Sequence, residues 1–340
     1  LASIKELIRS GTGGYFPRRL VKRDVEHAAL KAAVFSNLAY CWWFHNSIRA
    51  FWAQGREMAV ARHCPAEGPQ RAHAYATHAV LCGALIGRAR RAARYAERAV
   101  SICTQGGDEW GKAHATHLYG VALVASGEYR RAITLLTAAA EGFDRTADRW
   151  EAHTSRWHRA LALYRLGERE DAAREAGEIH RLAKAIGDRQ ATASAICIRA
   201  LACDGEGVDE NEGADLHGGF DVQSALTYLL GRAIALLGAS RLEDADDVLG
   251  DAATEIRRRR LLNSYVTPIL SWRATVARWQ AEVSAPGSVA ARRWAVRAAV
   301  RTTIAAAASG IYQAEREHVR HEVKQWPSMV RHALLRRSTP

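Results

Sequence analysis

Residues 114–150 read HATHLYGVALVASGEYRRAITLLTAAAEGFDRTADRW, and this stretch decides the fold. Apolar side chains recur there at helical spacing on both sides of a Ser-Gly-Glu break at residues 126–128. Glycine tolerates the left-handed backbone that ends a helix, so the break predicts a tight turn. We therefore expect a helix hairpin, with a first helix that ends near Ala125 and a second that begins near Tyr129.

The hairpin recurs along the chain. A Gly, an Ala five residues later and an Asp twenty-one residues after the Gly each return every forty residues. The three sets are Gly87, Gly127 and Gly167; Ala92, Ala132 and Ala172; and Asp108, Asp148 and Asp188. A fourth, degenerate copy has Ser240 and Ala245 at the first two positions. Repetition at this length is typical of a stacked array in which each hairpin buries its face on the next.

Two features of the repeat have structural interpretations. Asp108 and Asp148 precede a helix and are predicted to be N-caps. Trp110 and Trp150 each follow two residues later, and their equivalent placement predicts packing between repeats.

The repeat resembles a known family. Five residues share the spacing of the tetratricopeptide signature: Gly120, Gly127, Tyr129, Ala132 and Ala139. The forty-residue unit exceeds the usual period of about 34 residues. It is similar to the helical-repeat arm that follows the ATPase module of bacterial STAND-type signalling regulators. The phrases that carry this likeness are THLYG at 116–120, LYRLGE at 163–168 and GDRQA at 187–191. The resemblance implies an all-α, right-handed superhelical solenoid of tetratricopeptide-like hairpins.

Length and composition agree with that fold class. A chain of 340 residues is long for one compact core, whereas an array of repeats escapes this limit. Pro is scarce and no run alternates β-branched residues, so we expect almost no sheet. The expected segments are an N-terminal lead-in at 1–25, tetratricopeptide-like repeats at 26–203, an acidic Gly-rich loop at 204–221, degenerate helical repeats at 222–326 and a basic tail at 327–340.

Three local expectations follow. The acidic loop contains no Lys or Arg and is either a mobile spacer where a helix was lost or an acidic arm that docks on a basic groove. Helices are expected at 222–238, 242–259 and 289–309, and Pro327 is expected to end the last helix. Because the chain begins with Leu, we expect it to be a piece of a longer protein, with an ATPase or kinase module upstream.

Catalytic signatures are missing from the sequence. It contains no phosphate-binding GxxxxGK loop, GxSxG elbow, HExxH pair or dinucleotide fingerprint. The six Cys form no CxxC pair, which predicts reduced thiols in a cytoplasmic protein. No apolar stretch is long enough to cross a membrane. We therefore expect a non-catalytic protein that has no cofactor. An all-helical enzyme is a less favoured alternative.

Histidine pairs mark the first helices of successive repeats. They are His73 and His78, His114 and His117, and His153 and His158. The tetratricopeptide resemblance places first helices on the concave face, and it implies a groove for a protein or peptide. The candidate groove residues are Asn37, Thr77, His78, His114, His117, Trp157, Tyr164 and Arg165. Two alternatives stay open: buried histidines that hydrogen-bond between helices, or a zinc site of His114, His117 and a third histidine.

The charge balance leaves a choice of partner. The formal net charge is +12, with basic surpluses at 1–31, 257–260 and 292–337. Such an excess bears on solubility and non-specific binding rather than on fold. Our leading hypothesis is a binding scaffold for a peptide, protein or effector, acting as the sensor or regulatory arm of a larger bacterial signalling protein. The second is a regulator arm that binds nucleic acid through its basic helices.

Overall fold

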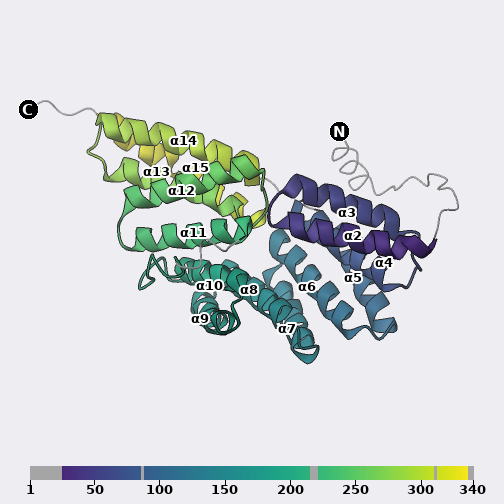
Figure 1. Ribbon diagram of the computed structural model, residues 1–340. Coiled ribbons are helices and arrows are strands. Elements are labelled where there is room, and N and C mark those ends of the chain that lie inside the picture. The colour runs from purple at the N-terminus through teal and green to yellow at the C-terminus, as the bar shows by residue number, and fades with distance from the viewer. Residues whose placement is uncertain (1–24, 86–87, 215–220, 310–311, 336–340) are drawn as a thin grey trace, which may run out of the picture. The chain divides into compact units, whose positions relative to one another are not determined.

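The computed structural model describes residues 25–85, 88–214, 221–309 and 312–335, and these ranges are helical (Figure 1). They hold fourteen α-helices, one π-helix and no strand. The prediction of an all-α protein is confirmed. Most of the expected lead-in at 1–25, Gly87 and the last five residues lie outside the described ranges.

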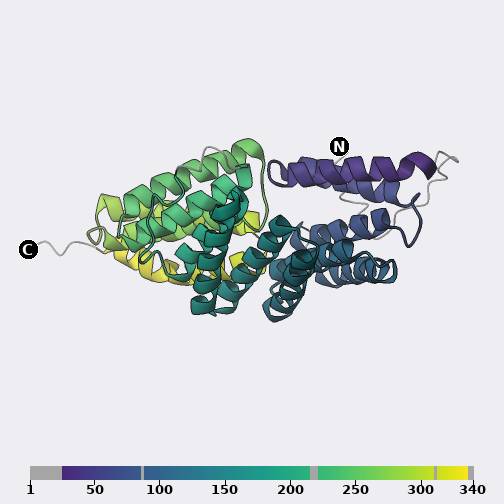
Figure 2. The same ribbon diagram turned by 60° about the horizontal axis from the view of Figure 1, so that its bottom comes forward.

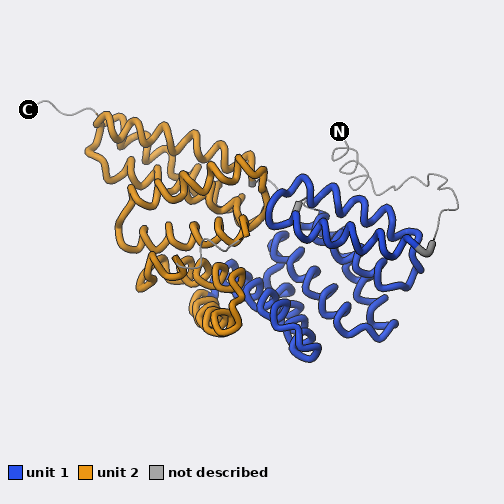
Figure 3. Tube along the Cα trace, in the orientation of Figure 1, with its two compact units in different colours: residues 1–168 blue, residues 169–340 orange. Residues whose placement is uncertain are grey.

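The chain divides into two compact units (Figure 3). Unit 1, residues 1–168, contains α2 (Val25–Trp43), α3 (Ser47–Ala61), α4 (Pro69–Val80), the π-helix η1 (Leu81–Leu85), α5 (Ala89–Gln105), α6 (Glu109–Ser126), α7 (Tyr129–Arg145) and α8 (Arg149–Leu166). Unit 2, residues 169–340, contains α9 (Arg169–Ile186), α10 (Arg189–Ala202), α11 (Val222–Gly238), α12 (Leu242–Arg259), α13 (Thr267–Val283), α14 (Val289–Ser309) and α15 (Gln313–Leu334).

Within each unit, helices that are neighbours in sequence pack against each other in series. Figures 1 and 2 show this for α2 and α3, which lie side by side in both views. In unit 1 the first helices of the hairpins also contact one another, from α2 to α4, from α4 to α6 and from α6 to α8. This second set of contacts brings residues far apart in sequence together on α2, α4 and α6.

The repeated residues of the sequence have equivalent structural roles. Asp108, Asp148 and Asp188 cap α6, α8 and α10, and the Oδ1 atom of each accepts a backbone N–H at 2.8, 3.1 and 3.0 Å respectively. Gly127 and Gly167 end α6 and α8 with φ angles of 84° and 93°, in the left-handed region. The N-caps predicted at Asp108 and Asp148 and the turn predicted at Gly127 are therefore confirmed.

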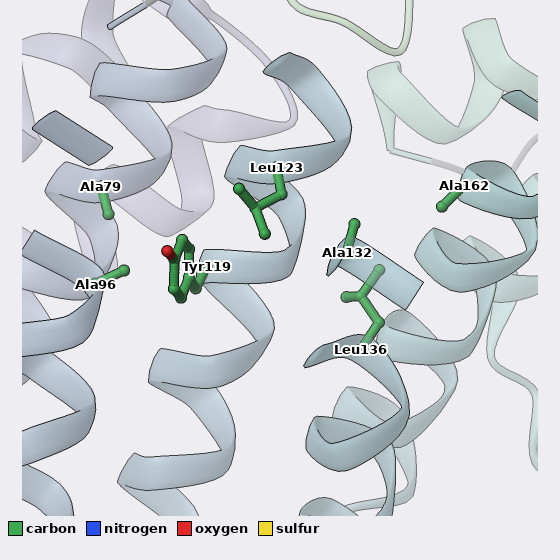
Figure 4. Close-up of a cluster of buried hydrophobic side chains, with 7 residues drawn as sticks. All are labelled: Ala79, Ala96, Tyr119, Leu123, Ala132, Leu136 and Ala162. Carbon is green, nitrogen blue, oxygen red and sulfur yellow. The ribbon is translucent and has the colours of Figure 1, made fainter. Parts of the chain in front are cut away.

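Alanine builds much of the core. In unit 1, seven buried side chains from α4 to α8 form one cluster (Figure 4). They are Ala79, Ala96, Tyr119, Leu123, Ala132, Leu136 and Ala162. Small side chains let the helices approach closely; a Cβ added to Gly120 would lie only 2.7 Å from Cγ of Leu136 on α7. Such close packing fixes the helices of unit 1 against one another.

The acidic segment is not a bare spacer in its described part, residues 204–214. Glu210 accepts a hydrogen bond at 2.5 Å from Arg241, the residue before α12, and Glu212 pairs with Arg199 of α10. Gly205 lies so close to α11 that an added Cβ would come within 2.1 Å of the Ile234 carbonyl oxygen. These contacts agree with the alternative of an acidic arm that docks on basic side chains.

The prediction for Pro327 is wrong. Helix α15 continues through it to Leu334, so most of the expected basic tail at 327–340 is helical. A proline inside a helix lacks the N–H that would bond to the carbonyl four residues earlier, here that of Val323. Met329 and Ala333, beyond the proline, are buried against alanines of α13 and α14. Packing of this apolar face explains why the helix does not stop.

Candidate functional site

A cavity of about 310 Å³ lies in unit 1 between α2, α3, α4 and the start of α6. Its polar lining comes from residues that only the packing of α2, α3, α4 and α6 brings together. They include Ser36 and Asn37 of α2, Glu57 of α3, His73 of α4, and Trp110 and His114 of α6. Asn37 and His114 are the two predicted groove residues that line it.

Glu57 and His73 form the centre of this site. Oε1 of Glu57 lies 2.9 Å from Nδ1 of His73, and Glu57 is only 1 % exposed. Burial by itself lowers the pKa of His73, but the hydrogen bond and charge of Glu57, together with the charge of Glu151, outweigh it and raise that pKa above its usual value. The pair is therefore an imidazolium held by a buried carboxylate over more of the pH range than a free histidine allows.

The second carboxylate oxygen of Glu57 has no partner. Oε2 is buried and makes no hydrogen bond in the described residues. Leaving a buried polar atom unsatisfied costs on the order of 1–3 kcal/mol, more if it is charged. The buried Glu322 of unit 2 is different, because its Oε1 accepts from Thr275 at 2.8 Å and its Oε2 from Arg278 at 2.8 Å. Both oxygens of Glu322 are therefore satisfied within the protein, whereas Oε2 of Glu57 keeps an unused acceptor.

Three rings stack beside this pair. The rings of His73 and His114 are parallel within 11° at a centroid distance of 4.8 Å, and the ring of Trp110 stacks with that of His114 at 5.0 Å. Burial, then the charges of His73 and His117, lower the pKa of His114 well below its usual value. His114 is therefore neutral at neutral pH and keeps a ring nitrogen that accepts hydrogen bonds. Trp110 also donates its Nε1–H to Asp148 at 2.9 Å, which agrees with the predicted packing between repeats.

Several predicted groove residues are buried between helices instead of lining the cavity. His78 is 0 %, His117 3 % and Trp157 4 % exposed, which corrects their placement on an open groove. His78 lies 3.1 Å from Oε1 of Gln54, and Nδ1 of His117 lies 2.9 Å from Oγ of Ser155. Gln54 lies on α3 and Ser155 on α8, so each of these two histidines bonds to a neighbouring helix. This matches the alternative of buried histidines that hydrogen-bond between helices.

The remaining candidates lie away from the cavity. Thr77 is half-buried and donates its hydroxyl to the carbonyl of His73 at 3.1 Å. Tyr164 and Arg165 are half-buried in the last turn of α8 and do not line the cavity. These three residues are therefore no part of the site described here.

Sequence reasoning missed Glu57 and Ser36 as site residues. Glu57 follows a run that includes buried Phe51 and Ala53 and precedes buried Met58, so a charged residue on an apolar helix face was the available signal. That signal does not reveal its partner, because His73 lies on the next helix.

The site does not have the geometry of a nucleophile relay. Oγ of Ser36 lies 3.1 Å from Nδ1 of His73 and 3.5 Å from Nε2. A relay needs the acid and the nucleophile on opposite ring nitrogens, whereas Ser36 is nearer to the nitrogen that Glu57 already uses. Across the described ranges, no group of three or more His, Cys, Asp or Glu is arranged to hold a metal ion.

Comparison with models of known protein families and with curated proteins gives no match. No helix in the described ranges has an apolar stretch long enough to span a bilayer. Two arginines of the basic run at 257–260, Arg258 and Arg259, bond to Glu255 of the same helix. The Glu57 cavity is the part of the described structure whose chemistry points to a ligand.

Proposed function

We propose that this chain is a non-catalytic helical-repeat scaffold that binds a ligand in the cavity between α2, α3, α4 and α6. The observation behind this proposal is Glu57, a buried residue that lines a 310 Å³ cavity and whose Oε2 has no hydrogen-bond partner among the described residues. Binding sites for small ligands are mainly apolar cavities with a few well-placed polar groups, and this cavity has that composition. The ligand is a small effector or a side chain of a partner protein, because a cavity of this volume suits groups of that size.

The proposal includes the context that the sequence resemblance suggests. In it the hairpins form a right-handed tetratricopeptide-like solenoid with a unit of about forty residues. The chain acts in the cytoplasm as the sensor arm of a signalling protein that also contains an ATPase or kinase module. Two observations support the solenoid. Asp108, Asp148 and Asp188 cap equivalent helices, and successive first helices of unit 1 contact one another.

The test is to fill the cavity from its mouth. Ala33 of α2 lines the cavity and is exposed, so Ala33→Trp puts an indole into the entrance without disturbing the core. Val34→Trp is the matched control, because the neighbouring residue is also exposed and does not line the cavity. Libraries of small metabolites and short peptides are screened by thermal shift, and ligands are confirmed by calorimetry.

We expect Ala33→Trp to abolish binding of the confirmed ligands and Val34→Trp to leave it unchanged. Ligands that bind the parent chain and Ala33→Trp equally well would contradict the cavity as the binding site.

A further inference from the structure

We propose that the ligand of this cavity carries a protonated amine, which donates hydrogen bonds to Oε2 of Glu57 and to the carboxylate of Asp108. This inference rests on the proposed function and names the chemical class of the ligand. It comes from the charges of the cavity wall, from two oxygens that have acceptor capacity left, and from an aromatic ring at the rim.

The charge of the wall is acidic in a basic protein. The chain has 48 Lys and Arg, yet none of them lines the cavity in its described part. The lining carboxylates are Glu57 and Asp108, and His73 is the one lining group with a raised tendency to be positive. Since Glu57 neutralises His73, the negative charge of Asp108 remains for a ligand.

Asp108 can take part without losing its structural role. Its Oδ1 accepts the Gly111 N–H at 2.8 Å and caps α6. No hydrogen bond to its Oδ2 is found among the described residues, and the side chain is half-buried in the cavity wall. Glu57 and Asp108 both line the cavity, and each has one carboxylate oxygen to which no described residue donates a hydrogen bond. An ammonium group has three N–H donors and can serve both.

The other lining groups suit the same ligand. Asn37, Gln70 and Ser36 supply neutral oxygen acceptors, and neutral His114 supplies a ring nitrogen. Trp110 is 39 % exposed at the rim, and the face of an indole attracts cations. A carboxylate or phosphate ligand would instead meet two like charges.

The amine competes with the proton of His73. Bound ammonium and protonated His73 would both lie beside Glu57, so binding releases that proton. The groups that act on or stack with His73 are Glu57 of α3, Glu151 of α8 and His114 of α6, and Asp108, the N-cap of α6, lines the same cavity. Amines keep their own proton to a pH of about 10. Amine affinity therefore rises with pH between 6.0 and 8.5, whereas affinity for an anion that pairs with His73 would fall.

The experiment measures binding to the full chain by calorimetry at pH 6.0 and pH 8.5. Butylamine, 1-butanol and butyrate form a set of one shape with positive, neutral and negative heads. Two further probes separate the sources of an amine: cadaverine as a free metabolite-like diamine, and an acetylated, amidated neutral peptide with a single Lys. The peptide with norleucine in place of that Lys is its control.

The variants are Glu57→Gln and Asp108→Asn. Asn is as good an N-cap as Asp, so Asp108→Asn removes charge and keeps the helix start. Asp188→Asn makes the same change at the equivalent cap of α10 and is the matched control. We expect butylamine to bind while 1-butanol and butyrate do not, an affinity loss of about tenfold or more in each site variant, and none in Asp188→Asn.

Each other outcome counts against the amine. Butyrate binding that strengthens at pH 6.0 and is lost in Ala33→Trp would overturn it and leave the proposed function standing. Butylamine that binds Glu57→Gln and Asp108→Asn as tightly as the parent would also overturn it. Failure of Ala33→Trp to affect any ligand would remove the proposed function and this inference together.

Discussion

Three aspartates, spaced forty residues apart, each determine where a helix begins: Asp108, Asp148 and Asp188. Each carboxylate accepts an N–H that the first turn of a helix leaves without an internal partner. These capping roles were predictable for Asp108 and Asp148, because capping depends on residues within three positions. The role of Glu57 was not predictable, because its burial and its bond to His73 exist only after α3 and α4 pack.

Gly167 tests how strongly the left-handed backbone at a helix end favours glycine. It ends α8 at φ 93°, and a side chain there would meet no neighbour within 4 Å, so only backbone strain opposes one. We expect Gly167→Ala to destabilise the protein by about 1 kcal/mol, since a non-glycine residue strains in the left-handed region. Gly177→Ala, inside α9 with equal space and ordinary helical backbone, should stabilise by up to about 1 kcal/mol. Urea denaturation measures both, and equal signs for the two variants would contradict this account.

At the scale of elements, apolar periodicity was a reliable guide, whereas the proline at position 327 was not. The helices expected at 222–238, 242–259 and 289–309 coincide with α11, α12 and α14. No sequence pattern indicated η1, where the chain forms a π-helix at Leu81–Leu85 directly after α4. Pro327 wrongly predicted the end of the last helix. The helix continues because Met329 and Ala333 are buried against partners in α13 and α14, which the sequence does not reveal.

Replacing Pro327 tests how much this proline destabilises helix α15. Pro327 is exposed, so replacing it loses no core contact, and Pro327→Ala restores a donor for the Val323 carbonyl. We expect stabilisation of about 1–3 kcal/mol, read as a higher Tm and urea midpoint. Pro69→Ala is the control, because a proline in the first turn of α4 breaks no internal hydrogen bond. A neutral or destabilising Pro327→Ala would mean that the helix is adapted to its proline.

At the scale of the whole molecule, buried histidines are concentrated in unit 1. Burial, then the Arg91 charge, lowers the pKa of His78 to about 3, and burial lowers that of His158 to about 3. Burial and neighbouring histidines lower those of His114 and His117 well below the usual value. A histidine that is neutral in the fold binds a proton after unfolding, so acid favours the unfolded chain.

We predict that stability falls as the pH drops from 7.5 to 5.0. His78 and His158 each remove about 2 kcal/mol at pH 5.0, because a pKa near 3 replaces one near 6.5. His114 and His117 act in the same direction. Glu151 opposes them: burial, then the Asp148 charge, raises its pKa to about 7, and its protonation returns about 2 kcal/mol. The raised pKa of His73 also favours the fold in acid.

The measurement is urea denaturation of the full chain at pH 7.5, 6.0 and 5.0. His158→Gln should lose about 2 kcal/mol less between pH 7.5 and 5.0 than the parent does. His321→Gln, at an exposed position of α15, should follow the parent curve. Stability that is flat or rising toward pH 5.0 would contradict neutral buried histidines.

The carboxylate of Asp148 makes two contacts, and the second limits which insertions and deletions this chain tolerates. Asp148 caps α8 through Oδ1 while its Oδ2 holds the indole N–H of Trp110, at the start of the preceding first helix. Adding one residue within α6 or α7 would turn everything beyond it by about 100° around the helix axis. Insertions and deletions are therefore tolerated poorly between Trp110 and Asp148, and a viable change there would need to come in whole helical turns.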